Sequence, residues 1–206
     1  MYLPQKIISE NIKTGVSINF PTKRHCRPTI LCKKACYAKS GPMLLPVSRK
    51  KQQYVSDYFK GNNLRQVIGE CWNFQTVRLN GCGDFLAGHL TNILTLAREC
   101  THTMFYGMTR KPEIANVLNN QLPNLKLLLS VDATTPKKVS ENYPGKICFG
   151  PRRAIDTVPN DKRIITVFPY HCHGKVITGI PKHKKDCPAV WHKVSGCMKC
   201  KRCWNW

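Results

Sequence analysis

Residues 125–131 read LKLLLSV, and five of these seven residues are leucine or valine. A run this apolar is typical of a parallel strand buried on both faces, because the crossover helices of a parallel sheet cover it from both sides. The segment therefore predicts a sheet of parallel strands and an α/β fold class.

The segments on either side of this run alternate between strand and helix patterns. Further strands are predicted at residues 15–20, 76–80, 103–108, 146–150 and 163–170. Helices are predicted at residues 48–60 with Ser48 as the cap, at 63–74, at 88–99, and at 111–120 with Pro112 in the first turn. This alternation implies right-handed crossovers. We expect a partial (β/α)6 parallel barrel or curled sheet over residues 1–175, followed by a small cysteine-rich metal segment at residues 176–206.

Unusual residues follow the predicted strands, where the sites of parallel α/β folds gather. In chain order they are a loop around Cys26, Gly81-Cys82-Gly83-Asp84, Thr109-Arg110, Asp132, Pro151-Arg152-Arg153 and His171-Cys172-His173. The sequence therefore predicts a functional site at the carboxyl edge of the sheet.

Charge and hydropathy limit the partners and the compartment. The chain has 33 Lys and Arg against 11 Asp and Glu, a net charge of +22, which predicts affinity for nucleic acid or other polyanions. Lysines and polar residues interrupt the apolar runs at the N-terminus, and no run approaches the roughly 18 apolar residues of a membrane span. We therefore expect a cytoplasmic protein without a membrane partner.

Twelve cysteines in a reducing compartment are better interpreted as metal ligands, redox groups or buried thiols than as disulfides. Four of them, Cys187, Cys197, Cys200 and Cys203, form a C-x9-C-x2-C-x2-C run. Closely spaced thiolates of this kind reach different irons of a [4Fe–4S] cluster, whereas a zinc ribbon offers two separated C-x2-C pairs. We expect a cluster here, with zinc or free thiols as the alternatives.

A second group, Cys26, Cys32 and Cys36, has only three cysteines. Three thiolates on a four-iron cluster leave one iron without a protein ligand, and that iron can bind a substrate or cofactor. As alternatives, His25 or one of Cys82, Cys148 and Cys172 supplies the fourth ligand, the three thiols and His25 hold zinc, or the thiols are buried structural groups.

The motifs CRPTILCKKACYA, VRLNGCGDF, MTRKPE and SVDATTP occur in this order, ahead of a terminal CP…CxxCxxC. This combination resembles the phage-encoded gene-product-88 family over nearly the whole chain. It is more distantly similar to the core of the radical S-adenosylmethionine enzymes. The second resemblance implies a six-unit β/α partial barrel, an open cluster on three cysteines, an added C-terminal cluster, and S-adenosylmethionine bound at the open iron. The first implies the cytoplasm of a bacterial host or phage-infected cell.

The resemblance also implies roles for individual residues. Cys26, Cys32 and Cys36 would hold the open cluster, and Asp84 would contact the amino group of S-adenosylmethionine. Ser130 and Asp132 would meet its ribose or carboxylate, and Arg110 could pair with the carboxylate. As an alternative, Asp84 and Asp132 cap the helices that follow them.

Three functions remain open at this point. The first is an iron–sulfur protein with two [4Fe–4S] clusters, which either uses S-adenosylmethionine or exchanges electrons with a donor protein. The second is a basic, metal-stabilised protein that binds nucleic acid, with stacking contacts from Trp191, Trp204 and Trp206. The third is a redox protein whose open iron binds sulfide or a thiol.

Overall fold

The computed structural model describes residues 5–11, 15–39, 41–119, 121–169, 171–172, 175–176, 180–188 and 200–203 of the 206-residue chain. Within these residues a seven-stranded sheet runs in chain order. Its strands are β1 (Ile8–Asn11), β2 (Gly15–Ile18), β3 (Thr76–Arg78), β4 (Met104–Thr109), β5 (Leu125–Val131), β6 (Ile147–Arg152) and β7 (Ile164–Pro169). A separate antiparallel pair joins β8 (His171–Cys172) to β9 (Lys175–Val176).

The mixed α/β fold class and the parallel arrangement of β2 to β7 are confirmed. The sheet is open, with β1 and β7 at its edges, so a barrel is not confirmed. The antiparallel β1 was not predicted. In this strand the half-buried Ser9 lies between the buried Ile8 and the exposed Glu10. One carboxylate oxygen of Glu70 accepts the backbone N–H groups of Ile7 and Ile8, both at 2.9 Å. This strand therefore depends on a contact with a distant residue.

Helices occupy the predicted places, with shifted ends. The helix predicted at 48–60 is α2 (Pro46–Tyr58), which begins with Pro46 in its first turn, so the prediction of Ser48 as its cap is wrong. The others predicted are α3 (Arg65–Cys71), α4 (Leu90–Glu99) and α5 (Pro112–Leu118). Short helices that were not predicted are α1 (Ile30–Lys34), α6 (Lys137–Glu141) and the 3-10 turns η1 (Tyr37–Lys39), η2 (Gly41–Leu44) and η3 (Ala87–His89).

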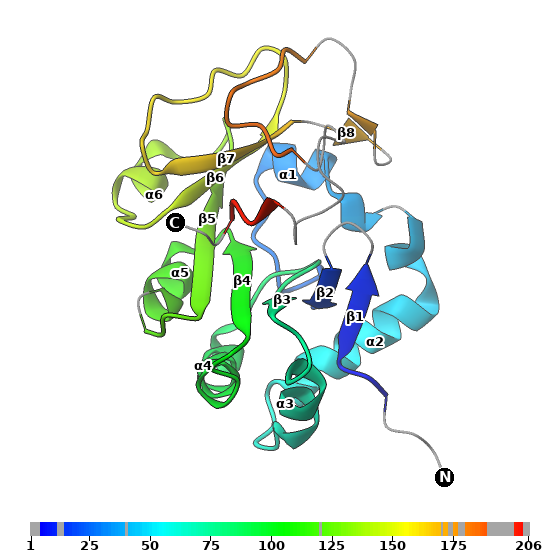
Figure 1. Cartoon of the computed structure of the whole chain (residues 1–206). Coiled ribbons are helices and arrows are strands. Elements are labelled where there is room, and N and C mark those ends of the chain that lie inside the picture. The colour runs from blue at the N-terminus through cyan, green and yellow to red at the C-terminus, as the bar shows by residue number, and fades with distance from the viewer. Residues whose placement is uncertain are drawn as a thin grey trace.

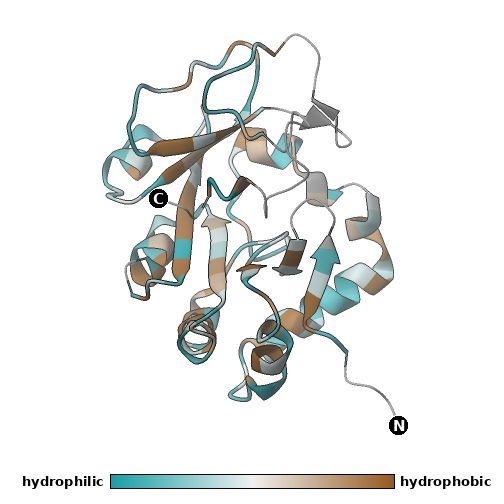
Figure 2. Ribbon diagram, viewed as in Figure 1, coloured by the Kyte–Doolittle hydropathy of each residue, from teal (hydrophilic) through white to brown (hydrophobic). Residues whose placement is uncertain are grey.

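The main core lies between the sheet and its helices. In β5, Leu125 and Leu127 are fully buried and pack in one cluster with residues of α4 and α5 such as Leu96 and Leu118. Helices lie around the outer side of the curved sheet in Figure 1, and Figure 2 shows the apolar residues concentrated in the strands and on the helix faces. The other face of β5 carries Lys126 and Ser130, which are only partly buried, so this strand is less apolar on one face than its sequence suggests.

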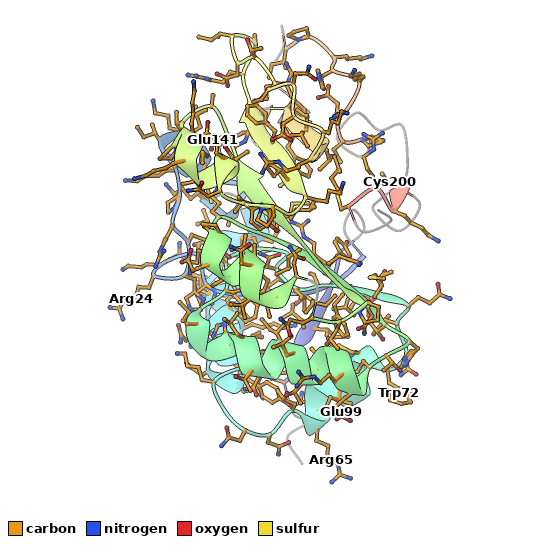
Figure 3. The ribbon with its side chains drawn as sticks, turned by 90° about the vertical axis from the view of Figure 1, so that its left-hand side faces the viewer. Arg24, Arg65, Trp72, Glu99, Glu141 and Cys200 are labelled. Carbon is orange, nitrogen blue, oxygen red and sulfur yellow. The ribbon has the colours of Figure 1, made fainter. Side chains whose placement is uncertain are left out.

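The two ends of the sheet differ in what they carry. Trp72 and Glu99, which precede β3 and β4, lie at one end of the molecule, away from Cys200 (Figure 3). The loop that carries Cys26, Cys32 and Cys36 is called the cysteine loop below. This loop and the loops after β3, β4 and β5 lie at the carboxyl edge of the sheet. None of the helices in the described part of the chain combines the length and the apolar character needed to cross a bilayer.

Candidate functional site

Arg110, directly after β4, connects the ends of three neighbouring strands. Its backbone N–H donates to a carboxylate oxygen of Asp84, which follows β3, at 3.2 Å. Its guanidinium lies 3.0 Å from the carboxylate of Asp132, which follows β5, and donates to the carbonyl of Gly150 in β6 at 3.0 Å. The predicted site residues Asp84, Arg110 and Asp132 therefore do meet at one edge of the sheet.

The cysteine loop is fastened to the same place. Thr29 donates its hydroxyl proton to Asp132 and accepts the backbone N–H of Cys32 at 3.2 Å, so it caps α1 and ties it to the end of β5. The guanidinium of Arg110 also lies against the thiol of Cys32. These contacts bring α1 to the carboxyl edge, although Thr29 is 103 residues from Asp132 in the chain.

The thiols of Cys26, Cys32 and Cys36 are half-buried and lie within electrostatic reach of one another. Burial raises the pKa of Cys26 to about 12, and the negative charge of Asp84 adds to this effect. Burial also raises the pKa of Cys32, but there the positive charge of Arg110 opposes the rise. The Cys26 end of the site therefore holds the carboxylate of Asp84 and the ammonium of Lys111, and the Cys32 end holds the ion pair of Arg110 and Asp132.

Asp84 is only 4% exposed, and both of its carboxylate oxygens accept hydrogen bonds. One oxygen accepts the N–H of Phe85 at 2.8 Å and the hydroxyl of Thr109 at 2.7 Å. The other accepts only the N–H of Arg110 among the described residues. Burial raises the pKa of Asp84, against the effect of these bonds. One oxygen therefore keeps the capacity to accept a further proton donor.

Asp132 is also held by local contacts. One carboxylate oxygen accepts the backbone N–H of Thr134 at 2.9 Å and its hydroxyl at 2.7 Å. Its backbone N–H in turn donates to the hydroxyl of Thr135 at 2.9 Å. Asp132 therefore closes a turn but does not cap a helix, because the N-cap of α6 is Pro136, and the N-cap of η3 after Asp84 is Leu86. The capping alternative is wrong for both residues, and the bond of Asp132 to Thr29 gives it a long-range role.

The turn that carries Asp84 packs closely against the start of the cysteine loop. The N–H of Phe20 donates to the carbonyl of Cys82 at 3.0 Å. Gly83 has φ +76°, and a Cβ atom there would lie 2.2 Å from the carbonyl oxygen of Phe20, so only glycine fits. The thiol of Cys82 donates to the same carbonyl at 3.4 Å, and burial raises its pKa to about 12.

Three of the residues at this site could not be recognised from the sequence. Lys111 is 5% exposed, and its ammonium group donates to the carbonyl of Phe85, close to Asp84 and Cys26. Ser56 and His89 are fully buried and surround His25. Their only signal is a polar residue on a helix face, which is too common to be selective.

His25 was considered as a fourth metal ligand, but both of its ring nitrogens have partners. Nδ1 lies 3.2 Å from the carbonyl oxygen of Asp84, and Nε2 lies 3.2 Å from the hydroxyl of Ser56. The residue is 5% exposed, and burial lowers its pKa. In this conformation neither nitrogen points at the neighbouring thiols with a free lone pair.

Ser130 lies on β5, opposite Cys148 in β6. Burial raises the pKa of Cys148 to about 11, while a hydrogen bond with Ser130 and the charges of Arg110 and Arg78 act in the opposite direction. Ser130 is therefore tied to a buried thiol within the sheet.

The C-terminal group is partly described. Cys187 adds to the outer edge of β7, because its N–H donates to the carbonyl of Val167 and the N–H of Val167 donates to the carbonyl of Lys185, both at 2.8 Å. Arg202 donates to the carbonyl of Asp186 at 2.8 Å, which brings the half-buried Cys203 toward Cys187. Cys200 is also half-buried. Cys197, Trp191, Trp204, Trp206, His173 and the side chain of Cys172 lie outside the described residues.

A buried ion pair holds the Cys187 segment in place. The guanidinium of Arg152 lies 3.5 Å from the carboxylate of Asp186, and both side chains are about 95% buried. Arg152 also donates to the carbonyl of Pro181. Across the described part of the chain, no three His, Cys, Asp or Glu side chains are gathered tightly enough to hold a single metal ion.

A comparison with protein families confirms the resemblance to the phage family. The family model described as gene product 88 matches residues 4–206. Searches of curated proteins and of solved structures give no match. With its motifs in order and nearly its whole length matched, this chain belongs to the gene product 88 family.

Proposed function

We propose that this protein is an iron–sulfur protein whose N-terminal loop, through Cys26, Cys32 and Cys36, holds a [4Fe–4S] cluster with one iron open to a small ligand. The observation that carries the proposal is the meeting of three half-buried thiols from one loop with Asp84, Arg110 and Asp132 at the carboxyl edge of a parallel sheet. A bound cluster would supply one-electron chemistry and a Lewis-acidic iron at this edge.

The donor set fits a cluster better than a single ion. A zinc ion needs its ligands about 2.0 to 2.3 Å from one centre. The described cysteines are not gathered in this way, and His25 has both nitrogens engaged. In a four-iron cluster each thiolate binds a different iron, so the ligands stand further apart. Burial raises the pKa of Cys26 and of Cys32, so these two thiols would release their protons when a cluster is loaded.

We infer a ligand with an ammonium and a carboxylate group, as in S-adenosylmethionine, from one hydrogen-bond acceptor and one cation of the site. The spare acceptor of Asp84 lies at the Cys26 end, and Arg110 lies at the Cys32 end. Nη1 of Arg110 lies 3.0 Å from Asp132 but has no well-aligned hydrogen bond among the described residues. We therefore assign the guanidinium of Arg110 to the carboxylate of the ligand. The chain-order parallel sheet also supports the likeness to radical S-adenosylmethionine enzymes.

We assign a second cluster to Cys187, Cys197, Cys200 and Cys203. The proposal is supported by the contact between Arg202 and Asp186, which draws the last cysteines toward Cys187. Ferredoxin-like spacing of the last three cysteines supports iron over zinc.

The test is anaerobic iron and sulfide analysis with Mössbauer and electron paramagnetic resonance spectra, recorded with and without S-adenosylmethionine. About eight irons per chain are expected from two four-iron clusters, with one signal changed by the ligand. The triple variant Cys26→Ala, Cys32→Ala, Cys36→Ala should keep about half of the iron. Cys71→Ala, which removes a buried core thiol, is the matched control. Zinc in place of iron would overturn the proposal.

The variant Asp84→Ala tests the ligand separately from the cluster. It should weaken the binding of S-adenosylmethionine without loss of iron, because the carboxylate contacts the proposed ammonium position and no metal. Asp57→Ala, an exposed carboxylate on α2, serves as the control. If no iron signal changes when S-adenosylmethionine is added, the remaining hypothesis is a redox protein whose open iron binds sulfide or a thiol.

A nucleic-acid-binding function is the second candidate, and one observation favours it. Between Glu10 and Asp57 the chain has ten Lys and Arg residues and no acidic residue, and this stretch includes the cysteine loop. Binding of a 20-nucleotide single strand should weaken steeply with salt if this surface contacts phosphates. An affinity that is independent of salt would exclude this candidate.

A further inference from the structure

Ser56, in α2, lies between the imidazoles of two buried histidines. Its hydroxyl oxygen is 3.2 Å from Nε2 of His25 and 3.4 Å from Nε2 of His89. The second nitrogen of each ring has a backbone partner. Nδ1 of His25 is 3.2 Å from the carbonyl oxygen of Asp84, and Nδ1 of His89 is 3.4 Å from the backbone nitrogen of Leu86. The chain of contacts thus runs from η3 through α2 to the cysteine loop.

The two backbone groups at its ends determine the direction of every hydrogen bond. The N–H of Leu86 can only donate, so Nδ1 of His89 accepts and its proton is on Nε2. The carbonyl of Asp84 can only accept, so the proton of His25 is on Nδ1 and its Nε2 accepts. The single hydroxyl proton of Ser56 must then go to His25.

The surroundings hold both rings in place. His25 is 5% exposed and His89 is fully buried, and burial lowers the pKa of His89 to about 4. The ring of Phe20 stacks on His89 with centroids 4.8 Å apart, and on His25 with centroids 6.3 Å apart. The ring of His89 also interacts with the backbone of Ser56, and it accepts the N–H of Leu86. His89 is therefore fixed by more than the hydroxyl, whereas Nε2 of His25 has Ser56 as its only donor among the described residues.

We propose that Ser56 and His89 are positioning residues for the cysteine loop, which hold His25 as its Nδ1–H tautomer and thereby tie Cys26 to the backbone of Asp84. This inference rests on the proposed function, since its consequence is a fixed place for the first cluster ligand. An imidazole beside a metal site is a common ligand. Here both nitrogens of His25 are used in hydrogen bonds to Asp84 and Ser56, so His25 does not bind the iron that the three cysteines leave without a protein ligand.

The first test needs no metal. In metal-free protein labelled with ¹⁵N-histidine, nitrogen spectra at pH 7.5 should show His25 protonated on Nδ1 and His89 protonated on Nε2. Ser56→Ala should move the Nε2 resonance of His25 and leave the tautomer of His89 unchanged. Ser140→Ala, which removes an exposed serine hydroxyl on α6, is the control and should move neither. A proton on Nε2 of His25, or an unmoved resonance in Ser56→Ala, overturns the inference.

The second test addresses the loop itself. A chelator should remove iron from the reconstituted Ser56→Ala protein about fivefold faster than from the wild type, as the loss of one buried hydrogen bond predicts. Ser56→Thr, which keeps the hydroxyl, should restore the slow rate. Equal rates in the wild type and Ser56→Ala overturn the positioning role. A magnetic coupling between an imidazole nitrogen and the wild-type cluster also overturns the positioning role, because it would mean that a histidine is a cluster ligand. A wild type that assembles no cluster refutes the proposed function, while the tautomers still test the hydrogen-bond chain.

Discussion

His89 makes the stability of the fold depend on pH in a predictable way. The imidazole is fully buried, and its pKa is lowered from 6.5 to about 4, mainly by burial. Between these values the unfolded chain binds a proton that the folded chain does not. The free energy of unfolding must therefore fall as the pH is lowered from 7 to 4. A pKa lowered by about two and a half pH units, at about 1.4 kcal/mol per unit, gives a loss of about 3 kcal/mol.

The assay is urea unfolding of the metal-free protein, followed by circular dichroism at pH 7.0, 5.5 and 4.5. Other groups titrate in this range, so the informative quantity is the difference between the wild type and His89→Gln. The variant is expected to be less stable at pH 7, because its contacts to Ser56 and Leu86 are lost. Between pH 7.0 and 4.5 it should lose about 2.4 kcal/mol less than the wild type, since pH 4.5 lies above the folded pKa. His102→Gln, at an exposed histidine, is the control. Equal losses in the wild type and His89→Gln would refute a buried neutral imidazole.

Three further substitutions test other parts of the structure. Gly83→Ala should lower the free energy of unfolding in urea by at least about 2 kcal/mol, because φ is positive there and the new Cβ atom would clash with the carbonyl of Phe20. Gly69→Ala, at a position on α3 with no atom within 4 Å of the new Cβ, should raise it by up to about 1 kcal/mol. Arg110→Gln should cost about 3 kcal/mol because it leaves the buried carboxylate of Asp132 unpaired, and a double-mutant cycle with Asp132→Asn should show coupling; additive effects would contradict the ion pair. Glu70→Ala should cost about 2 kcal/mol and speed amide hydrogen exchange at the start of β1, and unchanged exchange there would contradict the anchoring role.

The longer parallel strands, such as β5 and β7, were predictable because they are apolar runs bounded by turn residues, and the order of the strands follows from the alternation with helices. The position of β1 was not predictable, since four residues with one charged side chain carry no strong pattern. Its anchors are Glu70, and Lys51, whose ammonium group donates to the carbonyl of Ile8 at 2.8 Å. Both partners come from helices more than 40 residues away, and no local pattern encodes such contacts.

The meeting of Asp84, Arg110 and Asp132 was predictable from their places after successive parallel strands. Their individual partners were not. The pairing of Arg110 with Asp132 depends on how far a side chain reaches across the sheet edge, and the bonds of His25 depend on the packing of α2 and η3 over the loop. A residue type shows which bonds it can make, but only the packed fold determines which of them it makes.

The outer edge of β7 carries a consequence for solubility. An uncovered edge strand offers unpaired N–H and carbonyl groups to other chains and promotes aggregation. Here that edge is covered by Lys185 and Cys187, whose backbone groups bond to Val167 at 2.8 Å. The covering segment also contains the first of the proposed C-terminal ligands. Because metal binding and local folding are coupled, iron starvation is expected to loosen this cover and let chains associate edge to edge. Iron supply would then set how much of the protein stays dispersed, apart from any chemistry at the cysteine loop.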